Sequence, residues 1–301
     1  MSVAAVPTPK PKLSERDTAP GKALRFLLRT PVNLILILLG VFWLIPTLGL
    51  FLTSILPAQA FTVKGWWQIF SEPSLATWNN YSQVLHNHAI THSLVITAEI
   101  AIANTLIVIV VGALAGYAFA WLEFPGRDWI FICVIALLVV PLQMALIPMF
   151  SFYNKVGLYD TVASIVLFHA AFGLPFAIFL LRNFFAGIPH ELLEAARIDG
   201  ASELKVFRTV VLPIGLPAIA SLAIFQFLWV WNDLLVALVF VGGTPDVAPL
   251  TVRVAELSGT RGTAWQLLSA GAFVALAVPL VVFLALQRFF VRGLLAGSVK
   301  G

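Results

Sequence analysis

The clearest pattern in the chain is a series of long apolar segments separated by shorter polar ones. A bilayer core of about 30 Å requires roughly 20 consecutive apolar residues in a helix, and each of these segments reaches that length. A spanning β-barrel would instead show alternating segments of about ten residues. The pattern therefore predicts an all-α polytopic membrane protein with six transmembrane helices. They occupy residues 32–56, 93–122, 129–150, 161–181, 212–241 and 267–289.

The composition supports a membrane protein and argues against a soluble one. Of the 301 residues, 60% are hydrophobic and only 11% are charged, whereas about a quarter of the residues of a soluble domain are charged. The net charge of +4 is compatible with a nucleic-acid partner, but the basic residues are sorted by membrane side and do not form a patch. We therefore expect a lipid bilayer, and no nucleic acid, among the partners.

The distribution of basic residues predicts the orientation of the chain in the membrane. Lysines and arginines concentrate in the N-terminal segment, after the second and fourth apolar segments, and in the C-terminal tail. The opposite side holds only Lys64, Lys155, Arg253 and Arg261. Because cytoplasmic loops are enriched in Lys and Arg, both termini are expected to be cytoplasmic. The first apolar segment is too long for the core of a cleavable signal peptide.

The polar segments divide the chain into four parts. Residues 1–30 form a cytoplasmic leader, rich in proline and charge, that cannot bury a core and is expected to be disordered. Residues 31–88 comprise the first transmembrane helix and an outer loop. Residues 89–290 form the core with the other five transmembrane helices, and they include the long inner loop 188–210. Residues 291–301 are a cytoplasmic C-terminal tail.

The inner loop 188–210 carries the signals of a helix at its start. Pro189 suits a first helical turn, and the acidic residues that follow it favour the positive end of a helix dipole. Arg197 lies three residues after Glu194, so the two side chains are expected on one helix face. The loop is therefore not a random linker.

A turn and a second short helix are expected next. Gly200 suits a left-handed cap that ends the first helix, and Ser202 suits the start of a second helix that runs to Pro213. The apolar residues of this bent pair need a cover, which a groove on a partner protein or the lipid surface would supply. They are Leu192, Leu193, Ala196, Ile198, Leu204 and Phe207. The small side chains of Ala195 and Ala196 favour close docking in a protein groove.

The spacing within this loop resembles a known family. The loop reads Glu194-Ala195-Ala196, three residues, Gly200, nine residues, and then Val210-Val211-Leu212-Pro213. This resembles the EAA loop of permease subunits in binding-protein-dependent ABC importers, with Val210 in place of the family's usual Ile. Four further segments are similar to the carbohydrate-uptake branch and to its maltose-type second permease. They are Phe124-Pro125-Gly126-Arg127, Trp231-Asn232-Asp233, Gln287-Arg288 and residues 293–301.

The resemblance implies a type I ABC importer permease fold and a role in transport. Such a chain forms half of the translocation pathway for a carbohydrate, with di- and oligosaccharides, including α-glucosides, as candidates. Its implied partners are a second permease subunit in a heterodimer, a dimer of ATPase subunits and an extracytoplasmic solute-binding protein. The chain itself is expected to bind no cofactor and catalyse no reaction, since ATP and Mg²⁺ belong to the ATPase. The implied location is the plasma membrane of a bacterium or archaeon.

The resemblance also assigns residues to the coupling of the permease with its ATPase. In the family, the EAA loop is a coupling helix in a cleft of the ATPase, and its glutamate pairs with an ATPase arginine. By resemblance, Glu194 takes that role and Gly200 makes the bend. The assigned coupling residues are Glu191, Glu194, Ala195, Ala196, Asp199, Gly200 and Ala201. The C-terminal residues that are assigned to the ATPase dimer interface are Gly297, Ser298, Val299 and Lys300.

A few polar side chains lie inside the predicted transmembrane helices. Ionisable groups cost about 2.5 to 3.5 kcal/mol at the centre of a spanning helix, so a polar group there is a candidate for function. The candidates for the solute pathway are Gln143, His169, Gln226, Asn232 and Asp233. Trp229 and Trp231 would add an aromatic face for a sugar, although residues two apart on a helix point in different directions. Interhelical hydrogen bonding is the alternative for all of them, and capping of a bend is a further alternative for Asp233.

The sequence lacks the motifs that would let the chain work alone. It has no Gly-x-x-x-x-Gly-Lys-Ser/Thr phosphate loop, so the energy is expected to come from another polypeptide. The catalytic motifs His-Glu-x-x-His and Gly-x-Ser-x-Gly of a membrane enzyme are also missing. The alternative is an ion-coupled secondary sugar transporter, which predicts inverted repeats and several buried carboxylates. The outer histidines His86, His88 and His92 lack a further ligand at suitable spacing, so no metal site is expected.

Overall fold

The structure is a computed structural model of the chain. It describes residues 19–60, 65–242, 244–257 and 264–298, and of these 19–30 and 288–298 by their backbone alone. The chain divides after Leu52 into two compact units. Helix α1 (Ala19–Ser54) accounts for the described part of the first unit and contains Pro31 and Pro46. Its first residues are helical, although the sequence assigned them to the leader.

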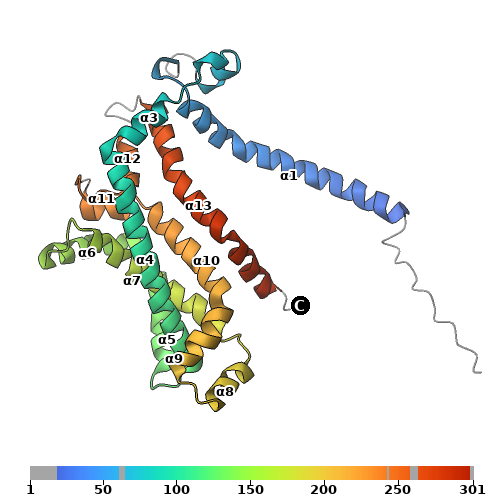
Figure 1. The fold of residues 1–301 in the computed structure, drawn as a ribbon, viewed down its shortest axis with the longest axis vertical. Coiled ribbons are helices and arrows are strands. Elements are labelled where there is room, and N and C mark those ends of the chain that lie inside the picture. The colour runs from blue at the N-terminus through green and yellow to red at the C-terminus, as the bar shows by residue number, and fades with distance from the viewer. Residues whose placement is uncertain (1–18, 61–64, 243, 258–263, 299–301) are drawn as a thin grey trace, which may run out of the picture. The chain divides into compact units, whose positions relative to one another are not determined.

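The second unit is built from helices, with no strand among its described residues (Figure 1). The predicted outer loop contains η2 (Trp66–Phe70), η3 (Pro73–Leu75) and α3 (Asn79–His86). The long helices are α4 (His88–Trp121), α7 (Val162–Phe185), α10 (Leu212–Trp231) and α13 (Trp265–Ser298). The shorter ones are α5 (Arg127–Ala136), η4 (Leu137–Val139), α6 (Leu142–Val156), α8 (His190–Ile198), α9 (Glu203–Val206), the π-helical turn η5 (Phe207–Val211), α11 (Leu235–Val241) and α12 (Leu250–Glu256).

Five helical segments of the described chain are long and apolar enough to cross a membrane. They correspond to the predicted helices at residues 32–56, 93–122, 161–181, 212–241 and 267–289. A sixth crossing is possible where α5 and η4 are followed by α6, but these two parts meet at an angle of 98°. The described residues therefore give five spans, or six if the bent pair crosses once.

Pro141 explains the bend in the third predicted helix. Val140, which precedes it, is extended with φ −70° and ψ 115°, a conformation that a following proline ring favours. Pro141 also lacks the amide proton that would continue the helix. The prediction of one continuous helix over residues 129–150 is therefore wrong. Other prolines lie inside helices that continue past them, namely Pro31, Pro46, Pro148, Pro175, Pro217 and Pro279.

The fifth predicted helix, residues 212–241, is also interrupted. Helix α10 ends at Trp231, and α11 begins four residues later. The carboxylate of Asp233 accepts hydrogen bonds from the amides of Val236 at 3.3 Å and Ala237 at 3.1 Å. This side chain therefore satisfies the free amides at the start of α11 and stabilises a new helix in a new direction.

Helices α4 and α7 pack closely against each other in the second unit. A Cβ added at Gly112 would lie 2.8 Å from Cβ of Ala177. One added at Gly116 would lie 3.0 Å from the backbone nitrogen of Arg182. Small residues four apart thus let the two backbones approach closely, as the glycine spacing in an apolar helix indicates. Helix α10 packs against α4, α7 and α13.

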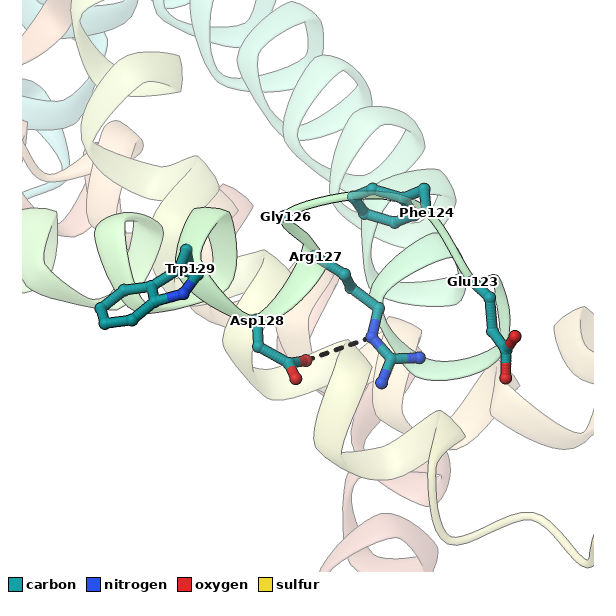
Figure 2. Close-up of a pocket in the computed structure, with 6 residues that line it drawn as sticks. All are labelled: Glu123, Phe124, Gly126, Arg127, Asp128 and Trp129. Atoms are coloured by element: carbon teal, nitrogen blue, oxygen red, sulfur yellow. Dashed lines mark hydrogen bonds and ion pairs between the residues drawn. The ribbon is translucent and has the colours of Figure 1, made fainter.

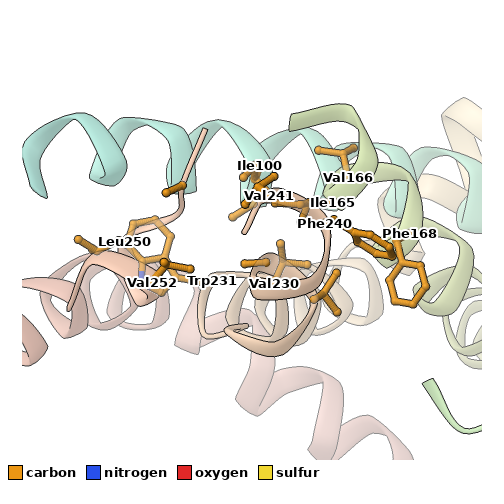
Figure 3. Close-up of a cluster of buried hydrophobic side chains, with 14 of the residues drawn as sticks. Ile100, Ile165, Val166, Phe168, Val230, Trp231, Phe240, Val241, Leu250 and Val252 are labelled. Atoms are coloured by element: carbon orange, nitrogen blue, oxygen red, sulfur yellow. The ribbon is translucent and has the colours of Figure 1, made fainter. Parts of the chain in front are cut away.

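The buried apolar side chains of the second unit form two clusters. The α11 cluster includes Ile100, Phe168, Trp231, Phe240 and Leu250, which come from α4, α7, α10, α11 and α12 (Figure 3). The α8 cluster includes Leu181, Phe185, Leu193, Val206 and Phe207. Within this unit, α3 and α12 lie at one end of α4, and α8 and α9 lie at the other (Figure 1).

We expect Gly112→Val to lower the melting temperature of the detergent-solubilised protein by several degrees. The added carbons would overlap Ala177, and overpacking costs about 1 to 3 kcal/mol. The matched control is Gly40→Val, because a Cβ at Gly40 would meet nothing within 4 Å. Both variants place valine in a helix, so intrinsic propensity is common to them. Equal melting temperatures for the two variants would contradict the close contact between α4 and α7.

Candidate functional site

The inner loop, residues 188–210, is called the α8–α9 loop from here on. Its first helix, α8, begins directly after Pro189, which lies outside the first turn at φ −56° and ψ 131°. Glu191 lies in the first turn of α8 and Arg197 in the last, so both charges complement the helix dipole. The first helix of the predicted pair is therefore present, and it starts one residue later than the sequence placed it.

The turn after α8 is formed by Gly200, which has φ +79°. Its amide donates to the carbonyl of Arg197 at 3.0 Å, and the amide of Ala201 donates to the carbonyl of Ala196 at 3.0 Å. These two bonds make a Schellman motif, in which a glycine in the left-handed conformation ends the helix. A Cβ at Gly200 would meet nothing within 4 Å, so the requirement for glycine lies in the backbone conformation.

The second helix of the loop does not end at Pro213, as predicted, but continues into the membrane. Helix α9 passes through η5 into α10 without a break. In the wide turn η5, the amide of Leu212 bonds to the carbonyl of Phe207, five residues earlier. This altered register lets the helix pass a proline, which has no amide proton to donate. The α8–α9 loop is thus joined directly to a transmembrane helix.

One face of the α8–α9 loop is covered by the chain itself. The buried apolar residues are Ile188, Leu193, Val206 and Phe207, all in the α8 cluster. The apolar residues that remain exposed are Leu192, Leu204 and Ile198, and the side chain of Ile198 is 86% exposed. The expectation that the loop needs an outside cover is therefore wrong for Leu193 and Phe207, whereas for Leu192, Leu204 and Ile198 it stays a prediction.

Most residues that the sequence assigned to ATPase coupling are accessible. Those that are exposed are Glu191, Glu194, Ala195, Asp199 and Gly200, and those that are half-buried are Ala196 and Ala201. The structure therefore brings these residues together on a short helix and its turn, and it leaves most of them open to a partner.

The charges of the loop pair differently from the sequence prediction. Arg197 does not bond to Glu194 but to Glu203, with Nε at 2.9 Å from one carboxylate oxygen and Nη2 at 3.1 Å from the other. This hydrogen-bonded carboxylate raises the pKa of Arg197. Glu194 instead lies 3.0 Å from Nδ1 of His190, and both of these side chains are more than half exposed. The bend at Gly200 explains the change, since it brings the start of α9 back to the end of α8.

Gln226 and Asn104 form a buried polar pair between α10 and α4. Nε2 of Gln226 donates to Oδ1 of Asn104 at 2.7 Å, and Nδ2 of Asn104 donates to the carbonyl of Val166 on α7 at 2.7 Å. These two hydrogen bonds join α4, α7 and α10 in a buried region with little water. Gln226 therefore forms an interhelical hydrogen bond, which was the alternative to a role in the solute pathway. The sequence analysis missed Asn104, although a single Asn in a long apolar segment was a usable signal.

Gln226 also lines a cavity of about 320 Å³ between α7 and α10. The lining residues are Phe172, Gly173, Phe176, Leu222, Phe225, Gln226 and Trp229. A Cβ at Gly173 would lie 2.7 Å from Nε2 of Gln226, so glycine at this position leaves room for the amide. The cavity offers aromatic rings and one amide without an ionisable group. Such a lining suits a neutral molecule that stacks and accepts or donates hydrogen bonds.

The other pathway candidates do not line this cavity. Gln143 is exposed on α6. Asn232 is exposed and donates Nδ2 to the carbonyl of Leu228 at 2.7 Å. Asp233 caps the start of α11, which agrees with the alternative prediction that it caps a bend. Its Oδ2 lies 3.8 Å from Nε2 of the fully buried His169.

The two tryptophans of α10 have different environments. Trp231 is 2% exposed, stacks on Phe227 at 5.3 Å and donates Nε1 to the carbonyl of Ala275 at 3.0 Å. It therefore belongs to the core, and the prediction that it stacks on a sugar is wrong. Trp229 lines the cavity, and its ring meets His169 edge-on at 5.0 Å. Trp229 is thus the one of the two that can present a face to a solute.

None of the four C-terminal residues assigned to the ATPase interface has a described side chain. Gly297 and Ser298 end α13 and are described by their backbone alone, whereas Val299 and Lys300 lie outside the described residues. Their role at an ATPase interface stays a prediction.

A second hollow, of about 310 Å³, lies at the turn between α4 and α5 (Figure 2). It is lined by Glu123, Phe124, Gly126, Arg127, Asp128 and Trp129. Arg127 donates Nε to Asp128 at 3.2 Å and Nη1 to the carbonyl of Leu122 at 3.3 Å, so its charge helps to close the turn. Elsewhere in the described parts of the chain, no three His, Cys, Asp or Glu side chains gather as metal ligands.

The matching protein family confirms the resemblance that the loop spacing indicated. A family described as "Binding-protein-dependent transport system inner membrane component" matches residues 108–296, which include the α8–α9 loop. The chain belongs to this family. The permease is therefore a component of a transport system and not an enzyme, and the match favours an ABC importer over an ion-coupled carrier.

Several similar proteins are named as permeases of uptake or transport systems. The osmoprotective compounds uptake permease protein GgtD of Synechocystis sp. is 47% identical over 95% of this chain and 97% of its own length. The alpha-glucoside transport system permease protein AglG of Rhizobium meliloti is 51% identical over 76% of this chain and 62% of its own length. The trehalose transport system permease protein SugB of Mycobacterium tuberculosis is 35% identical over 86% of this chain and 93% of its own length.

Solved structures share the fold of the permease. A bacterial ABC transporter involved in the import of the acidic polysaccharide alginate matches with a TM-score of 0.69 and 21% identity, over 93% of this chain and 100% of that chain. The inward-facing MetNI methionine ABC transporter matches with a TM-score of 0.51 and 19% identity, over 68% of this chain and 94% of that chain. The predicted ABC importer permease fold is therefore confirmed.

We expect Gly200→Val to open the turn between α8 and α9, and Gly200→Asn to preserve it. A β-branched residue in the left-handed region is strained by about 1 to 2 kcal/mol, whereas Asn tolerates that region better. The measurement is hydrogen exchange of the Ala201 amide, which we expect to be roughly tenfold faster in the valine variant. The same exchange rate in both variants would show that the Schellman motif does not hold the turn.

Proposed function

We propose that this permease is one of two membrane subunits of an ATP-driven, binding-protein-dependent importer of carbohydrate. Its partners are a second permease subunit, a dimer of ATPase subunits that binds ATP and Mg²⁺, and an extracytoplasmic solute-binding protein. Both termini and the α8–α9 loop face the cytoplasm, as the Lys and Arg distribution favours. The location is the plasma membrane of a bacterium or archaeon. Family membership supports the transport role.

The open face of the α8–α9 loop is the observation that carries the proposal. Three exposed apolar side chains, Leu192, Leu204 and Ile198, lie on a short segment whose opposite face is anchored in the α8 cluster. Exposed apolar groups beside a charge are typical of a surface that docks into another protein. Among the described ion pairs, Glu194 takes part only in the one with His190, and that pair is exposed. Its carboxylate therefore remains accessible to a cation of the partner.

We assign the loop to the coupling of ATP hydrolysis with transport. The anchored face ties it to α4, α7 and α10, while the open face docks on the ATPase. Closure of the ATPase dimer on ATP then moves α8, and with it the transmembrane helices against which the loop packs. The transmembrane helices alternate between inward-open and outward-open states. The C-terminal residues 297–300 extend toward the same ATPase dimer.

The solute that we propose is a neutral di- or oligosaccharide, with an α-glucoside as the first candidate. The name of AglG, at 51% identity, and that of SugB support this choice. The cavity beside Gln226 supports it as well, because its aromatic and amide lining has no charge to pair with an ionic solute. Trp229 would stack on a sugar ring and Gln226 would bond to its hydroxyl groups. Gln143, Asn232 and Asp233 have weaker support, since they do not line this cavity.

We expect Glu194→Lys to uncouple the importer while leaving the permease folded in the membrane. Reversal of a charge that meets an ATPase cation costs about 2 to 5 kcal/mol when the pair is desolvated, so uptake should fall at least tenfold. The measurement is uptake of a labelled α-glucoside by proteoliposomes that contain both permeases and the ATPase and are supplied with the solute-binding protein, together with co-purification of the ATPase.

The matched control for this experiment is Glu123→Lys. Glu123 is also an exposed glutamate, and it lies at the turn between α4 and α5, outside the α8–α9 loop in the sequence. The control should transport as the parent does. Normal ATPase co-purification together with normal uptake in Glu194→Lys would refute the proposed role of the loop.

A further inference from the structure

Three polar side chains from three helices meet where the α8–α9 loop contacts α4. The hydroxyl of Tyr117 on α4 donates to a carboxylate oxygen of Glu203 at 2.5 Å. Both carboxylate oxygens of Glu203 also accept from the guanidinium of Arg197, at 2.9 and 3.1 Å. The ion pair spans the turn from the end of α8 to the start of α9. The hydroxyl then links this closed turn to a transmembrane helix.

Tyr117 is a fixed anchor for this contact. Its side chain is 4% exposed, and its ring packs on Phe207 with centroids 5.3 Å apart. The preceding residue, Gly116, lies against the backbone of α7, and the nearby Trp121 donates Nε1 to the carbonyl of Phe185 at 3.0 Å. The end of α4 is therefore held to α7 by backbone contact and by a hydrogen bond. A displacement of the Tyr117 hydroxyl therefore displaces α4 and α7 together.

The backbone alone offers a softer path for motion from α8 into the membrane. Gly200 is the pivot between α8 and α9, and its surroundings are open. After α9, the chain enters the π-helical turn η5, where the hydrogen bonds are wider and a helix yields more easily. Movement of α8 would be absorbed at these two places if no side chain bridged them. Glu203 lies between them and is bonded on both sides.

We propose that Arg197, Glu203 and Tyr117 form a rigid linkage that transmits displacement of α8 to α4, and thereby to the α4–α7 pair. This inference rests on the proposed function, because it requires that an ATPase moves α8. The three are positioning residues that touch neither solute nor nucleotide. Their function is to make the loop and α4 move together.

The chemistry of the linkage suits a transmitted force. A bidentate contact between guanidinium and carboxylate fixes orientation as well as distance. Hydrogen bonds to a charged group are also stronger than those between two neutral groups. Glu203 is partly exposed, so its carboxylate stays ionised beside the guanidinium and can accept all three bonds.

The principal test is Tyr117→Phe in the complete complex with both permeases, the ATPase and the loaded solute-binding protein. The substitution removes one oxygen and keeps the ring on Phe207. We expect the ATPase to co-purify normally and basal ATP hydrolysis to be unchanged. The number of α-glucoside molecules imported per ATP hydrolysed should fall by about tenfold. A ratio within twofold of the parent would overturn the proposal.

The matched control is Tyr81→Phe. The hydroxyl of Tyr81 lies 2.8 Å from Oγ of Ser54, so this variant loses a tyrosine hydrogen bond at a site remote from the α8–α9 loop in the sequence and fold. We expect its ratio of import to ATP hydrolysis to equal that of the parent. An equal fall in both tyrosine variants would mean that the ratio reports general loosening, and it would overturn the proposal.

A double-mutant cycle tests whether the residues act as one unit. Glu203→Ala removes all three hydrogen bonds at the carboxylate, so adding Tyr117→Phe to it should lower the ratio no further. If the two effects instead multiply, the side chains act separately and there is no linkage.

Failure of this inference differs from failure of the proposed function. If the inference alone fails, Glu194→Lys uncouples transport while Tyr117→Phe and Glu203→Ala import normally. If the proposed function fails, the parent complex itself shows no ATP-dependent import.

Discussion

The close approach of α4 and α7 is the constraint on which the second unit depends. Gly112 and Gly116 remove side-chain bulk from the contact, so the backbones lie at a separation that a Cβ would not allow. In a bilayer, helices gain little from hydrophobic burial against one another, and close packing with interhelical hydrogen bonds takes its place. The bond from Asn104 to the carbonyl of Val166 belongs to the same contact. The pair therefore forms a fixed frame against which α10 packs.

This frame positions both of the candidate sites. On one side, α7 and α10 line the open cavity, and Gly173 leaves the space that Gln226 occupies. On the other, the end of α4 carries Tyr117, and the end of α7 leads into α8 and its buried Leu193. The α8–α9 loop thus has a covered face that belongs to the frame and an open face that does not. That asymmetry is what the proposed coupling requires.

The sequence predicted the features that depend on one residue or on a local run. Length and hydropathy located the spans, and Gly200 indicated the left-handed turn because other residues are strained there. Features that depend on distant contacts were not predictable in the same way. Arg197 pairs with Glu203 because the turn brings α9 back to α8, a geometry that helical spacing from Glu194 does not reveal. The bend at Pro141 had a visible signal, but the length of the apolar segment favoured a single helix.

The central claim is that the open face of α8 docks on an ATPase subunit. Its most direct test is a photoreactive amino acid at Ile198, which is 86% exposed, in cells that also make the ATPase. We predict that illumination joins the permease covalently to the ATPase, whereas the same amino acid at Trp67, 60% exposed on the predicted outer side, does not. Capture of the ATPase from Trp67, or its absence from the products at Ile198, would contradict the account.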